Sequence, residues 1–220
     1  MTTIYLIRHS VKFPQDEYES YKSKDDKNLR DDKSILSVTG EERAKIICSK
    51  NELDNIDIVF ASNMVRSQQT AKYLCFNQNK KMNIDERLNE RKCGIENSDV
   101  YPDWYERQYL HPDFKTKNGE SQNDVSKRMH SFLDEIIKKY DGKRIAVFSH
   151  GYAITFALLK WCKLVNVTND RVLTYEFKNK IIMNKQINAP EMFKLVFEHD
   201  QLISVELIEF DDLPFAHAGI

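Results

Sequence analysis

The chain has 220 residues, 41% of them hydrophobic, with 33 basic and 34 acidic side chains. This composition is typical of an ordinary globular protein, and a formal net charge of −1 gives no reason to expect binding to nucleic acid or to a membrane. Because there is no charged-then-apolar leader and no apolar run long enough to span a bilayer, we expect a cytoplasmic protein.

Length and cysteine spacing both constrain the organisation of the chain. A chain of this size can bury one substantial core, so we predict a single domain over residues 1–220, with lid-like insertions at about 11–35 and 95–118. The four cysteines are scattered without a Cys-x-x-Cys pair, which favours reduced thiols over disulfides or a zinc cluster.

The first predicted element is a buried strand from Thr3 to Ile7, a run of β-branched, aromatic and aliphatic residues. It leads directly into Arg8 and His9, a cation beside an imidazole. In open α/β sheets ligands bind at the carboxyl ends of the strands, so this pair indicates a ligand site.

A polar segment from Val11 to Lys33 follows the first strand. Its acidic and basic residues alternate, which predicts a solvated loop and not a basic patch. Because the segment leaves directly from His9, it is a candidate cover for the site.

A helix and a second strand are expected next. Thr39 and Glu42 have the spacing of a capping box, which predicts a helix that runs to about Asn51. The apolar run from Ile56 to Phe60 predicts the second strand.

Two charged residues in the middle of the chain are candidates for function. Ser62 is the expected N-cap of a helix from about Asn63 to Phe76, and Arg66 lies in its first turn, where a cation opposes the helix dipole. Taken alone, Arg66 fits an exposed surface residue as well as an anion-binding one. Glu90 follows a short extended piece, and an isolated glutamate is usually solvated, so its role depends on its neighbours.

The segment 95–118 is irregular and rich in aromatic residues. Within it, Tyr101, Tyr105 and Tyr109 fit one face of a short helix. Packing of these rings against the core is favoured over contact with a substrate.

A long helix and a second histidine-bearing strand come after this segment. Ser121 is the expected N-cap of a helix that runs to about Tyr140 with a continuous apolar stripe. The strand from Arg144 to Phe148 then leads to His150 and Gly151, as the first strand leads to Arg8 and His9.

The last part of the chain is rich in strands. We predict strands at Val172–Phe177, Met192–Phe197 and Leu202–Phe210, the last two joined as a hairpin. Strands that alternate with helices, followed by a strand-rich end, predict a three-layer α/β/α sandwich with a mostly parallel sheet and a C-terminal β-hairpin.

The residues at the two strand ends suit a phosphate group. Arg8 and Arg66 can each place a guanidinium fork on phosphate oxygens, which lysine cannot do bidentately. His150 adds a third donor, and Gly151 permits close approach to the backbone N–H groups of the helix that follows. Nearby cations are expected to lower the pKa of His9 and keep one ring nitrogen unprotonated near neutral pH.

Several blocks resemble, in order and spacing, the phosphoglycerate mutase-like branch of the histidine phosphatase superfamily. The blocks are Arg8-His9-Ser10, Leu36–Gly40, Ala61–Ala71, Arg87–Gly94, Gly119-Glu120-Ser121 with Arg128, and Phe148–Gly151. The match covers about residues 3–162, and it implies the phosphoglycerate mutase-like form of the sandwich.

The resemblance also implies roles for individual residues. His9 would be the nucleophile, forming a phosphohistidine that water hydrolyses, and Glu90 would protonate the leaving oxygen; no metal or other cofactor is needed in such a scheme. Gln15 stands where the family often has a phosphate-contacting Asn. Ser10 replaces the usual Gly, so its Cβ could crowd the backbone donor or its hydroxyl could add a phosphate contact.

Three functions remain open on these observations. The leading one is a metal-independent phosphatase acting on a small-molecule phosphomonoester. A phosphoglycerate-type mutase is the nearest rival, because Arg87–Arg91 resembles the mutase version of that block. Mutases, however, follow it with a longer insertion that carries adjacent arginines, and here only Arg107 stands in a shorter segment. The third is a catalytically weak protein of the same fold used for binding or regulation, which Ser10 suggests.

Overall fold

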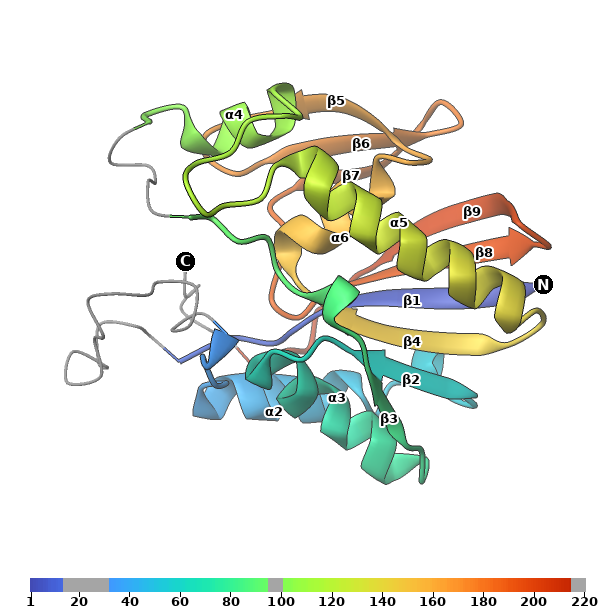
Figure 1. Cartoon of the computed structure of the whole chain (residues 1–220). Coiled ribbons are helices and arrows are strands. Elements are labelled where there is room, and N and C mark those ends of the chain that lie inside the picture. Colours follow the sequence, from blue (N-terminus) through green and yellow to red (C-terminus); the bar gives the residue numbers. More distant parts are fainter. Residues whose placement is uncertain (14–31, 95–100, 215–220) are drawn as a thin grey trace.

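A six-stranded sheet lies at the centre of the molecule in the computed structural model, which describes residues 1–13, 32–94 and 101–214 (Figure 1). The strand order is β3-β2-β4-β1-β8-β9. The strands are β1 (Thr2–Arg8), β2 (Ile58–Ala61), β3 (Met82–Ile84), β4 (Arg144–Ser149), β8 (Met192–Glu198) and β9 (Gln201–Ile208). The first four are parallel, and β8 and β9 add an antiparallel hairpin. This topology confirms the mostly parallel sheet with a C-terminal hairpin.

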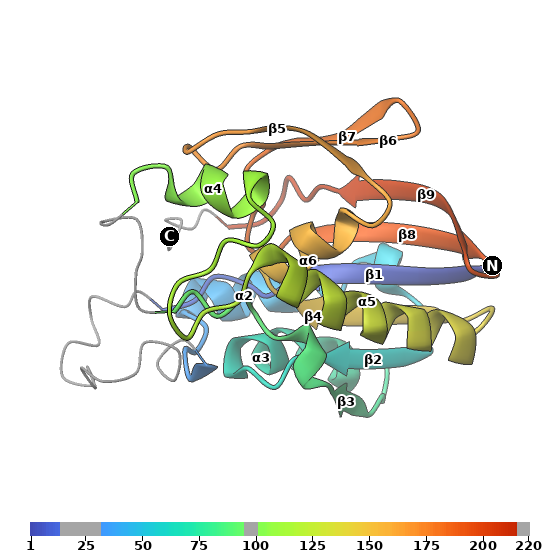
Figure 2. The same cartoon turned by 45° about the horizontal axis from the view of Figure 1, so that its top comes forward.

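Helices cover both faces of this sheet, as Figures 1 and 2 show. They are α2 (Val38–Ile47) and α3 (Val65–Asn77) on one face, and α5 (Gln122–Lys139) and α6 (Gly151–Leu158) on the other. Successive side chains of β1 point to opposite faces, so Tyr5 and Ile7 join the apolar cluster under α2 and α3, whereas Ile4 and Leu6 join the larger cluster under α5 and α6. The predicted three-layer sandwich is therefore confirmed.

A second, three-stranded sheet lies beside the first, with the short helix α4 (Trp104–Leu110) next to it (Figure 2). Its strands are β5 (Lys163–Val167), β6 (Leu173–Phe177) and β7 (Lys180–Lys185), paired antiparallel. The sequence predicted only β6. The two flanking strands are largely exposed, so they lack the apolar pattern of a buried strand and depend on pairing with β6.

Two of the three predicted helix caps are wrong. Helix α2 begins at Val38, with Ser37 and not Thr39 as its N-cap, and the Ser37 hydroxyl accepts a hydrogen bond from the N–H of Gly40. Helix α3 begins after Met64, and Ser62 does not cap it. The third prediction is confirmed, because Ser121 forms a capping box at the start of α5.

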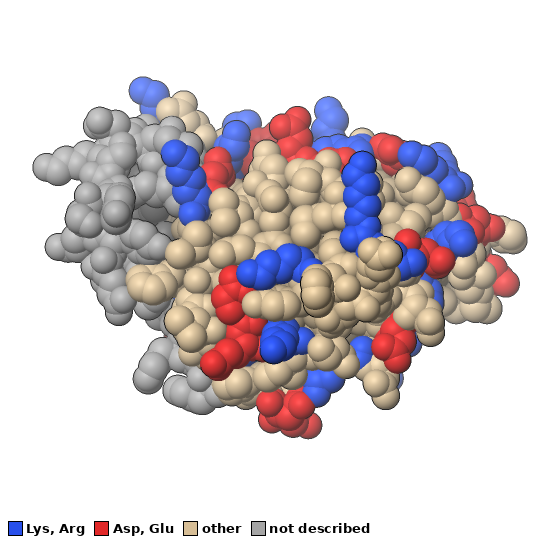
Figure 3. Space-filling view, turned by 90° about the horizontal axis from the view of Figure 1, so that it is seen from below, with Lys and Arg blue, Asp and Glu red and all other residues tan. Residues whose placement is uncertain are grey.

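On the face that carries α2 and α3, the described surface has no large patch of a single charge sign (Figure 3). Lys and Arg side chains alternate there with Asp and Glu (Figure 3). No helix in residues 1–13, 32–94 and 101–214 combines the length and the apolar character needed to cross a membrane.

Gly40 brings α2 close to the segment that leaves β1. The backbone N–H and the hydroxyl of Ser37 donate to the carbonyl oxygen of Val11 at 3.0 and 3.3 Å. A Cβ on Gly40 would lie 2.0 Å from the same oxygen. Only glycine therefore allows this contact, which fixes the start of α2 against the chain just after His9.

We expect Gly40→Ala to destabilise the protein. Alanine is favoured over glycine in a helix by up to about 1 kcal/mol, but overpacking costs roughly 1–3 kcal/mol, and here the obstacle is backbone. Urea unfolding should show a lower free energy of unfolding. Glu42→Ala, an exposed change in the same helix, should stay within about 0.5 kcal/mol of the parent. A stabilised Gly40→Ala variant would contradict this account.

Candidate active site

The two histidines at the strand ends lie side by side. β1 and β4 are parallel neighbours in which Arg8 pairs with Ser149, and the N–H of His9 donates to the Ser149 carbonyl at 2.9 Å. The ring centroids of His9 and His150 are therefore only 5.0 Å apart, and both residues are buried. Parallel strands in register thus bring together residues that are 141 positions apart.

The contacts of His9 determine which ring nitrogen carries the proton. Its Nδ1 lies 2.6 Å from the carbonyl oxygen of Ser10, which can only accept, so Nδ1 must donate. The Nε of Arg66, which can only donate, lies 3.1 Å from Nε2. Nε2 therefore holds a lone pair directed at the buried guanidinium of Arg66.

His150 has a different pair of surroundings. Its Nε2 lies 2.7 Å from the hydroxyl of Ser62, while its Nδ1 is buried without a hydrogen-bond partner among the described residues. Ser62 follows β2, the other neighbour of β4, so it meets His150 from the side opposite His9. The same hydroxyl accepts from the N–H of Met64 at 3.3 Å, and α3 begins only at Val65, so Ser62 lies too early in the chain to be the helix cap that the sequence predicted.

Burial and positive charge act on both imidazoles. Burial lowers the pKa of His9 well below its usual value, and the guanidiniums of Arg66 and Arg8 lower it further. Burial likewise lowers the pKa of His150, followed by the charge of Arg66 and the neighbouring His9. Both rings are therefore neutral near pH 7, as the sequence predicted for His9.

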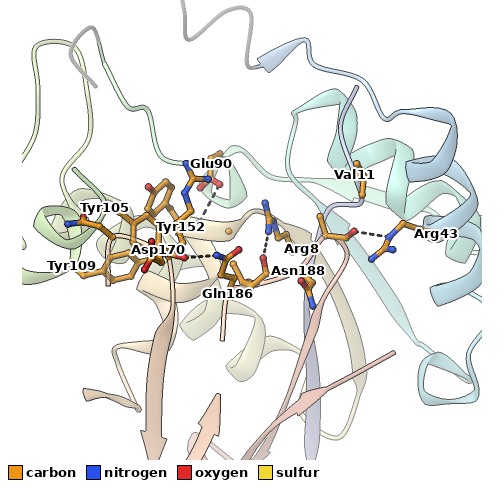
Figure 4. A pocket seen from close by; sticks show the side chains of 15 residues that line it. Arg8, Val11, Arg43, Glu90, Tyr105, Tyr109, Tyr152, Asp170, Gln186 and Asn188 are labelled. Atoms are coloured by element: carbon orange, nitrogen blue, oxygen red, sulfur yellow. Dashed lines mark hydrogen bonds between the residues drawn. The ribbon is translucent and has the colours of Figure 1, made fainter. Parts of the chain in front are cut away.

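Arg8 lies in the middle of the cavity at this sheet edge (Figure 4). Its Nη1 donates to the carbonyl oxygen of Ile187, and its Nε is buried without a partner among the described residues. Burial lowers the pKa of this guanidinium, while the negative charge of Glu90 raises it. A Cβ on Gly151 would lie 3.6 Å from Arg8 Nε, so the start of α6 faces this arginine closely.

Glu90 caps helix α6. Its carboxylate accepts hydrogen bonds from the N–H groups of Tyr152 at 3.3 Å and Ala153 at 3.1 Å. The sequence expected the N–H groups at this helix start to face phosphate, and two of them instead contact Glu90. Arg128 holds the segment by donating to the carbonyl oxygens of Asn89 and Glu90.

Of the remaining two candidates, Ser10 and Gln15, the structure describes only Ser10. Ser10 is buried; its N–H donates to the Thr70 hydroxyl at 3.0 Å, and its own hydroxyl has no partner among the described residues. The Cβ of Ser10 is thus accommodated without separating His9 from Arg66. Gln15 lies outside the described residues.

The cavity at this sheet edge has a volume of about 400 Å³; Arg8, Glu90 and Gly151 line it, whereas His9, His150 and Arg66 are buried behind its wall and do not. Tyr105 and Tyr152 form one wall, with ring centroids 5.8 Å apart, and the loop from Gln186 to Ala189 forms another. Tyr105 therefore both packs and faces the cavity, where the sequence favoured packing over contact with a substrate. Among the described residues there is no cluster of three or more His, Cys, Asp or Glu side chains suited to a metal ion.

Sequence reasoning missed Ser62, Thr70 and the polar residues of the β5–β6 turn. Ser62 carried a usable signal, because it ends a strand as His9 and His150 do. Thr70 lies one helical turn after Arg66, and its hydroxyl donates to the Arg66 carbonyl at 2.8 Å. The turn residues carried no signal, because they reach the cavity only through the second sheet.

The chain matches a known family and two groups of named relatives. The sequence model of the histidine phosphatase superfamily (branch 1) matches residues 4–179. A probable phosphoglycerate mutase GpmB of Cronobacter sakazakii is 26% identical over 162 residues, 70% of this chain and 72% of that protein. Phosphoserine phosphatase 1 of Hydrogenobacter thermophilus is 25% identical over 123 residues, 52% of this chain and 58% of that protein.

Solved structures share the fold over almost the whole chain. A mycobacterial glucosyl-3-phosphoglycerate phosphatase in complex with VO3 has a TM-score of 0.65 at 17% identity, covering 94% of this chain and 98% of that one. A phosphoserine phosphatase variant from Entamoeba histolytica, in complex with phosphoserine, has a TM-score of 0.63 at 20% identity, covering 94% and 97%. At these identities the likeness concerns the fold alone.

The buried neutral histidines predict that the protein loses stability in mild acid. Below the unfolded pKa of about 6.5 the unfolded chain takes up protons that the folded rings do not, so the free energy of unfolding falls as the pH falls. Between pH 7.5 and 5.5 each ring should contribute a loss of about 1.4 kcal/mol. Urea unfolding at both pH values measures the change.

A variant separates this effect from general acid sensitivity. His9→Gln should reduce the change between the two pH values by about 1.4 kcal/mol, because glutamine does not titrate. Part of the pH dependence should remain in this variant because burial lowers the pKa of His130 too. An unchanged pH dependence in His9→Gln would mean that folding does not lower the pKa of His9.

Proposed function

The chain belongs to the histidine phosphatase superfamily (branch 1), and we propose that it is a metal-independent phosphatase that hydrolyses a small-molecule phosphomonoester through a phosphohistidine on His9. One observation carries this proposal. The Nε2 of a buried, neutral imidazole holds its lone pair beside the buried guanidinium of Arg66. A nucleophilic nitrogen next to a fixed cation matches what phosphoryl transfer requires, which is positioning and charge stabilisation.

The phosphate would be held by the groups around His9. The Arg66 and Arg8 guanidiniums would contact its non-bridging oxygens, and the unpartnered Nδ1 of His150 would add a donor. The α6 N-terminus at Gly151 faces the same space. These cations lie where solvent is largely excluded, so a phosphate dianion would offset a charge that is expensive to bury.

The reaction would proceed in two displacements. Nε2 of His9 attacks phosphorus, the bond to the ester oxygen breaks, and Glu90 gives that oxygen a proton. Water then attacks the phosphohistidine, Glu90 accepts its proton, and phosphate leaves His9 neutral again. Glu90 suits both steps by position, because its carboxylate lies beside Gly151 and faces the cavity with Arg8.

The mutase alternative is supported by the relatives named as probable phosphoglycerate mutases. The segment in which mutases carry paired arginines offers only Arg107 here, and this argues against a mutase. Arg107 pairs with Asp103 and packs over the rings of Tyr101 and Phe114, so it does not face the cavity. A mutase would move phosphate between phosphoglycerate positions without releasing it, and a phosphatase would release inorganic phosphate.

The third alternative, a catalytically weak protein of this fold, was suggested by Ser10. Its side chain does not separate His9 from Arg66, and this favours an active enzyme. Turnover of a generic aryl phosphate distinguishes an enzyme from a binding protein.

We expect a covalent phosphoryl adduct on His9. Rapid quenching without acid during turnover of a phosphate ester, followed by intact mass measurement, should show an adduct that acid removes. His9→Ala should abolish it, whereas His111→Ala, an exposed histidine outside the cavity, should retain it. Chelators should leave activity intact. Because phosphoserine survives acid, an acid-stable adduct on Ser10 would refute the mechanism.

The loss of rate caused by Glu90→Gln should depend strongly on the leaving group of the ester. General acid catalysis contributes about 10²–10⁴-fold, so we expect a loss of roughly that size for an alkyl phosphate, whose alkoxide needs a proton. The loss should be far smaller for p-nitrophenyl phosphate, whose phenolate leaves unprotonated. Glutamine keeps the size of the side chain but only one of the two oxygens that accept from α6, so urea unfolding of the variant is needed to show that the fold is intact.

The burst phase isolates the first step, in which the phosphoryl group is transferred to His9. Glu90 also serves the hydrolysis of the phosphohistidine, so steady-state rates mix both steps, whereas pre-steady-state bursts report the first alone. Equal losses for the two esters in the burst would assign Glu90 a positioning role in place of acid catalysis.

A further inference from the structure

The cavity extends beyond the groups that would hold the transferred phosphate. From Arg8 it continues past Tyr105 to the turn between β5 and β6, where Asn169, Asp170 and Arg171 line its rim. The mechanism above does not use these residues. In a bound substrate, Asn169, Asp170 and Arg171 would contact the alcohol part, which leaves when the phosphate is transferred.

Three arginines line the cavity, and two have their guanidiniums engaged with the protein. Arg43 donates to the carbonyl oxygens of Ala189 and Pro214, and Arg8 donates to that of Ile187. Within the described residues, the guanidinium of Arg171 forms no hydrogen bond and no ion pair; it lies 6.0 Å from the ring of Tyr105. Arg171 is exposed, so its five N–H donors are open to water and to a ligand.

The turn that carries Arg171 is held from both sides. The Asn169 N–H donates to the Glu106 carboxylate at 3.0 Å, and the Glu106 N–H donates to the Asn169 amide oxygen at 3.3 Å. On the other side, the amide of Gln186 donates to the carbonyl oxygen of Asp170. The cation therefore stands on a fixed support between α4 and the wall loop.

The backbone at Arg171 adds a second observation. Its φ is +65°, in the left-handed region that long side chains rarely adopt. Most other non-glycine residues with positive φ here are asparagines, for which this conformation is less costly: Asn55, Asn79, Asn118 and Asn179. An arginine at such a position, in the lining of a cavity, suggests that its charge is used.

Tyr105 links the two cationic ends of the cavity. Burial raises the pKa of its phenol, and the charges of both Arg8 and Arg171 lower it, so both cations act on this one hydroxyl. Asp170 also lines the rim but forms no ion pair with Arg171 among the described residues, so it does not neutralise the guanidinium at contact distance.

We propose that Arg171 forms a second anion subsite, which selects phosphomonoesters whose alcohol part carries a further oxyanion, a carboxylate or a second phosphate. The inference rests on the proposed phosphatase function. The transferred phosphate lies at Arg8 and His9, the alcohol part packs along Tyr105, and its acidic group receives the guanidinium fork of Arg171.

Two matched substrate pairs test this subsite. O-phosphoserine and O-phosphoethanolamine differ only by a carboxylate, and ethylene glycol bisphosphate and hydroxyethyl phosphate differ only by a second phosphate. Phosphate release should give a higher kcat/KM for the acidic member of at least one pair, and the pair that discriminates identifies the anion. Arg171→Met should reduce that preference by about 10-fold, and Arg171→Lys should retain part of it.

Lys178→Met is the matched control. Lys178 also carries a cation at positive φ, 49°, in a turn of the same sheet, but it does not line the cavity, so its substitution should leave the preference intact. Equal turnover within both pairs, or an undiminished preference in Arg171→Met, would overturn the subsite and leave the phosphatase standing. No turnover of these esters or of p-nitrophenyl phosphate would overturn the proposed function instead.

Discussion

The burial of positive charge around a neutral imidazole is the interaction on which the rest of the site depends. Arg66 is buried and directs its Nε at the Nε2 of His9, while the neighbouring Arg8 is half-buried. Such charges are expensive to remove from water unless an anion accompanies them. In the proposed function, the phosphate of the substrate would supply this anion at one edge of the sheet.

The surrounding elements keep these groups in place. The Ser10 carbonyl fixes the tautomer of His9, and the Thr70 hydroxyl ties the same turn to α3. On the opposite wall, Arg128 holds the backbone that carries Glu90, whose carboxylate in turn caps α6. A carboxylate at a helix start is favoured by the helix dipole, so the geometry of the proposed acid is set by secondary structure and by one arginine.

The two sheets contribute different residues to the site. The parallel sheet delivers His9 and His150 from the ends of adjacent strands, where register alone fixes their separation. The smaller antiparallel sheet contributes a turn at the far end of the cavity, where Arg171 meets the ring of Tyr105. In the proposed function, the first arrangement would hold the phosphoryl group that all such esters share, and the second would contact the part in which they differ.

Local patterns in the sequence were sufficient for the strands that end in Arg8, His9 and His150 and for the capping box at Ser121, because each depends on neighbouring residues. The likeness of ordered motifs pointed to the family. Only the tertiary structure decided that Ser62 meets His150, that Glu90 caps α6, and that the β5–β6 turn reaches the cavity. These contacts join residues far apart in the chain, and such pairings follow from packing and strand register, which no local window of the sequence contains.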